Sequence, residues 1–343
     1  MFLLLYSLIA LVSTAIIWVG SGWLESSSER LSVYYELPPI IQGAVVVAVG
    51  SSFPELTTAV FSTLLHGEFE LGVAAIVGSA LFNVLVIPAL AGLFAKDVLR
   101  SNRDLVYKEA QFYLISVAVL LLVFSFAVIY NPVEGVSGSL AGEVTRPLVL
   151  LPLGMYGLYV FVQYQDTMDY QAEVSPGDIR VGREWAVLAG ALGTILVGVE
   201  GLVQTAIRFG DFFGTPSFLW GITVVAAGTS VPDAFVSIRA ARSGNAITSV
   251  ANVLCSNIFD LLVCIPAGAL VAGTGAIHYS IAAPMMAGLT LATLVVFLMM
   301  RTHLLVSRRE AWVLLGLYAV FVVWVGVETF GGVDFVPSLP PGT

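Results

Sequence analysis

The sequence GSSFPEL at residues 50–56 returns at residues 228–234 as GTSVPDA, and both copies lie inside long apolar stretches. Each copy places a glycine, two hydroxyl residues, an apolar residue, a proline and an acid in the same order. Proline cannot donate a hydrogen bond to the carbonyl one turn before it, so it disturbs a helix at that turn. A freed carbonyl and a carboxylate are costly in hydrocarbon unless they line a polar cavity. The two copies therefore predict a polar site within a membrane.

A second pair of matching segments follows the two motifs at nearly the same spacing. GSALFN occupies residues 78–83 and CSNIFD occupies residues 255–260. In each segment a serine precedes an amide or an acid by one helical turn, which places both side chains on one face of a helix. Two paired matches in the same order indicate that the halves of the chain are repeats.

The composition predicts a membrane protein. The chain has 343 residues, of which 58% are hydrophobic and 11% charged, and its mean hydropathy is +0.95. That leaves too little polar surface for a water-soluble globule. Because a spanning helix needs about 20 mostly apolar residues, we expect an all-α integral membrane protein with ten transmembrane helices. Their expected positions are residues 1–20, 38–65, 71–95, 109–130, 147–163, 184–205, 215–240, 246–271, 278–300 and 310–330.

Lysine and arginine residues predict the orientation. If the N-terminus is extracellular, twelve of the 14 cationic side chains flank the inner helix ends, and only Arg146 and Arg208 lie outside. Such a cytoplasmic excess is typical of membrane proteins. We expect a multi-pass protein of the cell membrane with both termini extracellular, and we interpret Arg239 and Arg242 as cytoplasmic anchors. The first apolar run could instead be a signal peptide, but it lacks the positively charged start of such peptides.

The chain divides near its middle. Five predicted helices precede the polar segment 164–183 and five follow it. This segment contains Pro176 and Gly177, so we expect a cytoplasmic linker between a first repeat at 1–163 and a second at 184–343. An odd number of helices per repeat makes the second repeat enter the membrane from the opposite side. The result is an inverted repeat with binding at its interface near the midplane.

The repeated segments carry an oxygen-rich set of candidate ligands. Calcium takes about six to eight oxygens in irregular geometry, whereas soft metals prefer nitrogen and sulfur. We therefore expect a small hard cation, and we interpret Cys255 and Cys264 as small buried apolar residues. Ser52 and Glu55 have the spacing of a helix capping box, but capping alone does not explain an acid inside a membrane. The candidate ligands are Glu55, Asp233 and Asp260, with the neutral Ser51, Ser52, Ser79, Asn83, Thr229, Ser230, Ser256 and Asn257.

At these residues the chain resembles the calcium/cation antiporter superfamily, whose two repeats carry G-x-S-x-P-E/D on one helix and S-x-x-x-N/D on the next. The matching regions are about residues 38–95 and 215–271. The resemblance implies that calcium binds to Glu55, Asp233, Ser51 and Thr229. It implies that sodium or potassium binds to Ala48, Ser52, Ser79, Asn83, Ala226, Ser230, Ser256, Asn257 and Asp260, with Ala48 and Ala226 acting through their carbonyls.

Within this superfamily the motifs look most like those of the potassium-dependent sodium/calcium exchangers. Asp233 stands where sodium/calcium exchangers more often have glutamate. Asp260 is similar to the aspartate that is associated with potassium transport in that branch. Prokaryotic relatives without potassium dependence also carry an acid there, so potassium coupling stays open.

Together these features predict a secondary active antiporter, not an enzyme, that exchanges calcium for sodium by alternating access, with helices 1–20 and 184–205 moving against the rest. A proton/calcium exchanger is the alternative, because a buried acid can carry protons. An intramembrane aspartyl protease is a remote alternative, since it would not require the symmetric hydroxyl-rich shell. A passive channel is disfavoured because three acids would hold an ion too tightly for fast exit.

The sequence also predicts the partners of the chain. We expect lipid and inorganic cations as partners, with no cofactor, and the sequence leaves the oligomeric state open. No basic patch indicates nucleic acid. The net charge of −9 suits a prokaryote from a salt-rich environment.

Overall fold

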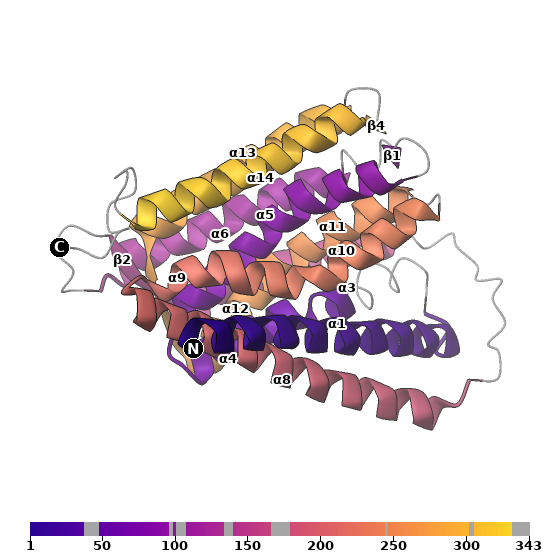
Figure 1. Ribbon diagram of the computed structural model, residues 1–343, viewed down its shortest axis with the longest axis horizontal. Helices are drawn as coiled ribbons and strands as arrows, with labels where there is room; N and C mark the ends of the chain where they lie inside the picture. The colour runs from indigo at the N-terminus through magenta and orange to yellow at the C-terminus, as the bar shows by residue number, and fades with distance from the viewer. Residues whose placement is uncertain are drawn as a thin grey trace.

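The computed structural model describes residues 1–37, 48–95, 99–100, 108–133, 140–165, 179–243, 246–301 and 305–330. Within these residues the chain is nearly all helical (Figure 1). The α-helices are α1 (Phe2–Tyr34), α3 (Ala48–Ser51), α4 (Phe53–Leu64), α5 (Phe69–Phe94), α6 (Ala110–Tyr130), α7 (Arg146–Gln165), α8 (Val181–Phe213), α9 (Ser217–Trp220), α10 (Ala226–Arg242), α11 (Ala246–Phe259), α12 (Ile265–Ala272), α13 (Tyr279–Arg301) and α14 (Arg308–Thr329). Two π-helical turns, η3 (Gly221–Val225) and η4 (Asp260–Cys264), join α9 to α10 and α11 to α12.

The described residues contain nine helical spans that are long and apolar enough to cross a membrane. They correspond to nine of the ten predicted spans, which confirms an all-helical membrane architecture. The remaining prediction, 38–65, lies partly outside the described residues. Its described part consists of α3 and α4, which meet at a turn at Ser52.

Two predicted helix ends are wrong because they were placed where the apolar run stops. α1 continues to Tyr34 and α8 extends from Val181 to Phe213. The added turns of α1 carry polar residues, and Arg30 Nη1 forms an ion pair with Glu184 Oε1 at 3.1 Å. Packing between two helices therefore prolongs each of them past its apolar segment, which hydropathy alone does not reveal.

Two small antiparallel sheets are absent from the all-helical prediction. Strand β1 (Leu99–Arg100) pairs with β4 (Leu305–Val306), and β2 (Ala141–Thr145) pairs with β3 (Thr274–His278). Figure 1 shows β1 and β4 at one end of the bundle and β2 at the other. The strands of each pair come from loops that the charge pattern assigns to one side of the membrane, so each sheet joins the two halves at one surface.

The centre of the bundle is formed by helices from both halves. α5 is buried along nearly its whole length, and it packs against α4 of its own half and α10 of the other. α4 in turn packs against α12. A Cβ atom on Gly78 would lie 2.4 Å from the carbonyl oxygen of Ile222, so only glycine permits this approach of α5 to η3. The helices that carry the motifs therefore interlock across the two halves.

The helices α1 and α8 lie side by side along one edge of the bundle and run in opposite directions (Figure 1). Gly20 and Gly198 lie at their contact, where an added Cβ would come within 2.9 Å and 2.7 Å of isoleucine side chains. Both helices also approach α10 at Gly228, whose nearest neighbours include Leu202 and Thr14. α8 also packs against α4, so the pair forms a separate layer against both motif helices.

The two motifs interrupt their helices differently. The first motif contains the turn at Ser52, between α3 and α4. In the second motif α10 runs through Pro232 without a break, and the irregular turn η3 lies immediately before it. The prediction of a broken turn at 228–234 is therefore wrong, because a helix can accommodate one missing hydrogen bond when its neighbours support the backbone.

Candidate functional site

The acids of both motifs and the polar residues of the partner helices meet in the centre of the bundle. Glu55 and Asp233 are each 1% exposed, and Asp260 is 0% exposed. Asp260 begins the π-helical turn η4, a form that often occurs at functional sites. The predicted hydroxyl and amide side chains are buried as well, namely Ser51, Ser52, Ser79, Asn83, Thr229, Ser230, Ser256 and Asn257.

Within each half, the serine of the partner helix donates to the acid of the motif. Ser79 Oγ donates to Glu55 Oε1 at 3.2 Å, and Ser256 Oγ donates to Asp233 Oδ2 at 3.0 Å. These two bonds join related positions of the repeats. The sequence repeat is therefore also a repeat of hydrogen bonding.

Hydroxyl pairs connect the two halves. Ser52 Oγ lies 2.6 Å from Ser256 Oγ, and Ser230 Oγ lies 2.7 Å from Ser79 Oγ. Ser52 makes no capping bond to the start of α4, and Ser230 lies inside α10. Neither hydroxyl therefore caps a helix, and both belong to the interface between the halves.

The symmetry ends at Asn83 and Asp260, which occupy related positions. Asn83 Nδ2 donates to Asp233 Oδ2 at 3.3 Å. An ionised Asp260 has no proton to donate in the same way. Asp260 and Asp233 are both charged neighbours of Glu55. One side of the site thus pairs an acid with an amide, whereas the other opposes two acids.

Four buried acceptor oxygens of this site have no hydrogen-bond partner. They are Glu55 Oε2, Asn83 Oδ1, Asp233 Oδ1 and Asp260 Oδ2. Asn83 donates to two acceptors, Asp233 Oδ2 and Asn257 Oδ1, which supports the assignment of its nitrogen and leaves its oxygen open. A buried acceptor without a partner is costly, and hard cations bound among these oxygens would remove that cost.

The three acids do not surround a single point. No group of three or more His, Cys, Asp or Glu side chains in the described part of the chain is arranged to hold one metal ion. An ion bound here would therefore take fewer than three carboxylates and complete its shell with neutral oxygens. The assignment of individual ions to individual residues stays a prediction.

The remaining predicted ligands differ in how available they are. Thr229 of the second half lies beside Glu55 of the first, and Ser51 of the first half lies beside Asp233 of the second. Each of these acids therefore has a hydroxyl neighbour from the other half. The Ala226 carbonyl already accepts from the hydroxyls of Thr229 and Ser230, at 3.3 and 2.8 Å. Ala48 is the first described residue of α3.

The amide of Asn257 is already engaged on both sides. Its Oδ1 accepts from Asn83 Nδ2 at 3.1 Å, and its Nδ2 donates to the carbonyl of Ala80 at 3.1 Å. Asn257 therefore holds α11 to α5 in this structure.

One side chain at the site had been interpreted only as apolar packing. Cys264 Sγ lies 3.7 Å from Asp260 Oδ1 and 4.0 Å from the carbonyl oxygen of Ser52. Its spacing of one helical turn from Asp260 was a usable signal. Cys264 thus supports the orientation of Asp260 through a weak thiol hydrogen bond.

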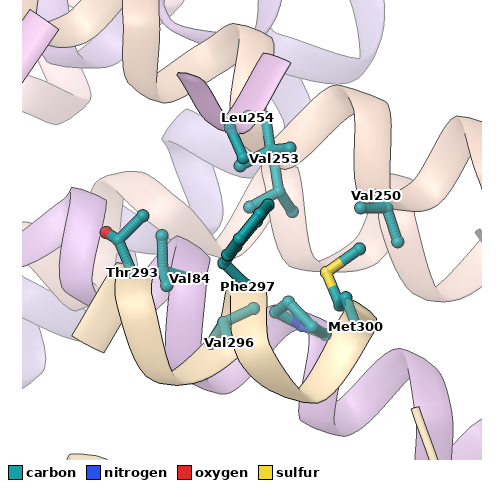
Figure 2. Close-up of a pocket in the computed structure, with 10 residues that line it drawn as sticks. Val84, Val250, Val253, Leu254, Thr293, Val296, Phe297 and Met300 are labelled. Carbon is teal, nitrogen blue, oxygen red and sulfur yellow. The ribbon is translucent and has the colours of Figure 1, made fainter. Parts of the chain in front are cut away.

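A cavity beside this region has a different character. Figure 2 shows that its wall consists largely of aliphatic and aromatic side chains from α5, α11 and α13, with Thr293 as an oxygen-bearing member. Hydrocarbon cannot replace the water around a cation. The cavity is therefore not part of a cation site.

Comparison with known proteins identifies the family of the chain. Residues 5–165 and 183–327 match the family described as sodium/calcium exchanger protein. The sodium/calcium exchanger MaX1 of Methanosarcina acetivorans is 22% identical over 353 residues, which cover 92% of this chain and 97% of that protein. The human sodium/potassium/calcium exchanger 4 is 42% identical over 100 residues, which cover 29% of this chain and 15% of that protein.

Two solved structures share the fold. The sodium–calcium exchanger NCX_Mj, soaked with sodium and strontium, has a TM-score of 0.62 at 21% identity, covering 93% of this chain and 96% of its own. The H+/Ca2+ exchanger CAX has a TM-score of 0.69 at 17% identity, covering 93% and 82%. The resemblance seen in the motifs is thereby confirmed, and the chain belongs to the sodium/calcium exchanger family of the calcium/cation antiporter superfamily.

Proposed function

We propose that this multi-pass membrane antiporter exchanges calcium for sodium across the cell membrane, with both termini outside. The observation that carries the proposal is the group of four buried, unpartnered acceptor oxygens from Glu55, Asn83, Asp233 and Asp260 at the interface of the two halves. Buried acceptors that lack donors require positive charge nearby. Exchange of cations at this one place is the simplest use of such a site.

Calcium suits the ligands in number and kind. Carboxylates from α4, α10 and η4 are combined with hydroxyl and amide oxygens. Calcium accepts this mixture in irregular geometry, whereas magnesium demands a near-ideal octahedron and releases water reluctantly. The divalent charge also offsets two of the buried carboxylates.

Sodium is favoured as the counter-ion because most of the surrounding oxygens are neutral. Hydroxyl pairs such as Ser52 with Ser256 coordinate a monovalent ion without any change of protonation. The relative MaX1 carries sodium/calcium exchange in its name. Protons are the second candidate, supported by the opposed acids Glu55 and Asp260, because two neighbouring carboxylates can share one proton.

Obligatory exchange follows from the cost of an empty site. Without cations, the buried acids Glu55, Asp233 and Asp260 would carry uncompensated charge through the hydrocarbon, which is expensive. Either calcium or several monovalent ions removes that cost. The layer of α1 and α8, in which α1 packs against α10 and α8 packs against α4, is the element that would slide between the outward-open and inward-open states.

Calcium uptake into proteoliposomes tests this function. An outward sodium gradient should drive uptake of radioactive calcium, and Glu55→Gln and Asp233→Asn should each reduce the rate by roughly tenfold or more, because a charged ligand is lost. The exposed Glu143→Gln is the matched control and should transport normally. Potassium and pH are varied independently. Uptake driven only by a pH gradient would show that the counter-ion is a proton and not sodium. Full activity in both site variants would refute the assignment of the site.

A further inference from the structure

Tyr113 lies outside both repeated motifs, yet it reaches the transport site. It belongs to α6, which packs against α11 and η4, the segments that carry Asn257 and Asp260. Its side chain is 0% exposed. A buried phenol normally places its hydroxyl against a hydrogen-bond partner.

The Tyr113 hydroxyl has no such partner. It lies within reach of the side chains of Asn257 and Thr293 and near the Asp260 carboxylate, but it makes no well-formed hydrogen bond with any of them. Asp260 Oδ2 and Asn83 Oδ1 are also unpartnered, and Asn83 is bonded to Asn257. Asn83 and Tyr113 therefore each carry an open oxygen and lie beside Asn257, and Tyr113 also lies near Asp260.

The neighbouring bonds show which way the phenol can turn. Thr293 Oγ1 donates to the carbonyl of Leu289 at 2.8 Å, so its lone pairs are left to accept a proton. If Tyr113 directs its proton to Thr293, its own lone pairs are left free to bind a cation. The hydroxyl is then an oxygen ligand and not a competing donor.

Thr293 also marks where the polar region ends. In Figure 2 its oxygen stands at the edge of a cavity whose labelled wall is otherwise apolar, including Val84, Val253 and Phe297. A cation cannot continue into that cavity. Tyr113 thus closes the oxygen-lined region on the side of α6.

We propose that the Tyr113 hydroxyl is a ligand of the monovalent cation that drives exchange, which it binds together with Asp260 and Asn83. This inference rests on the proposed antiport and adds a ligand from a helix that carries neither motif. One carboxylate and two neutral oxygens match the charge of sodium or potassium. Calcium, which requires more compensating charge, depends on Glu55 and Asp233.

The test compares Tyr113→Phe with Tyr156→Phe. Both changes remove only a buried hydroxyl that lacks a partner, but the groups that act on the Tyr156 hydroxyl are Cys255 and Cys264, whereas Tyr113 lies by Asn257 and Asp260. In Tyr113→Phe, the sodium or potassium concentration for half-maximal calcium exchange should rise by roughly fivefold, as expected for one lost polar interaction. Half-saturation by calcium should change little, and Tyr156→Phe should match the unmodified chain.

A binding readout separates this inference from the transport proposal. The melting temperature of the purified protein is measured against sodium chloride, potassium chloride and calcium chloride, with choline chloride as the inert salt. A weaker response of Tyr113→Phe to one monovalent ion alone supports the inference and identifies that ion. Equal responses in both tyrosine variants, or a parallel loss for calcium and the monovalent ions, would overturn it. Failure of cation-driven uptake in the unmodified chain would instead refute the proposed exchange.

Discussion

Asn83 and Asp260 occupy related positions in the two halves, and the difference between their side chains makes the site asymmetric. Asn83 donates to Asp233, while Asp260 adds a second acid near Glu55. A buried charge without a partner destabilises a folded protein. The charge of Asp260 therefore lowers the stability of the cation-free protein while it favours cation binding.

Replacing this acid by its amide should separate stability from transport. We expect Asp260→Asn to raise the melting temperature in sodium-free choline buffer by roughly 2–5 °C, because an unpaired buried charge is removed. The same change should reduce sodium-driven calcium uptake by about tenfold or more. Thermal unfolding and uptake are measured on the same preparation. Asp211→Asn, at an exposed acid, should alter neither quantity, and a variant that lost stability and transport together would show that Asp260 is structural.

At this scale the sequence revealed the site through repetition. Glu55, Asp233 and their serine partners were predicted because each occurs twice in the same setting, and the structure brings them together. Cys264 and Tyr113 were missed because neither is part of a repeat. The spacing of Cys264 from Asp260 was a local signal, whereas the position of Tyr113 depends on how α6 packs against η4, which a single sequence does not encode locally.

Among the helices and strands, the length of an apolar run predicted whether a helix exists better than it predicted where that helix begins and ends. The spans from α5 to α7 begin and end within a few residues of their predicted limits. α1 and α8 exceed theirs because they support each other. The strands β1 to β4 were not predicted, since segments of two to five residues gain their hydrogen bonds only from a distant partner.

Strand β3 also carries a pH-sensitive contact with the other half. The imidazole of His278 bonds to the carboxylate of Glu70 at the start of α5. This hydrogen bond raises the pKa of His278 above its ordinary value of about 6.5, with burial acting in the opposite direction and the charge of Glu70 adding to the increase. The backbone N–H of His278 also donates to Glu70, so β3 stays linked to α5 at any pH, and the ion pair strengthens that link while His278 is protonated.

The sign of the pH effect follows from that shift. A group whose pKa is raised by folding contributes its full stability below the unfolded pKa and loses it as the pH rises through the folded pKa. We expect the melting temperature to fall by on the order of 1–2 °C as the pH rises above about 6.5, given the partial exposure of the pair. Glu70→Gln should remove this step. An identical pH profile in Glu70→Gln would contradict the assignment to this pair.

At the scale of the whole molecule, the inverted relation of the halves explains the interlocked centre. α4 packs on α12 and α10 packs on α5, so neither half can close its polar face alone. The two sheets then join the halves at opposite ends of the bundle. Division of the chain at 164–183 stays a prediction, because residues 166–178 lie outside the described structure.

Orientation in the membrane is the last prediction, and it follows from charge. Because most cationic residues flank one end of the helices, Asp211 should face outside and Ser243 the cytoplasm. Both are exposed, on α8 and after α10. In intact cells a membrane-impermeant maleimide should label Asp211→Cys, whereas Ser243→Cys should react only after permeabilisation. The unmodified chain gives the background from Cys255 and Cys264. The reverse labelling pattern would place both termini in the cytoplasm, and the charge argument would then be wrong for this protein.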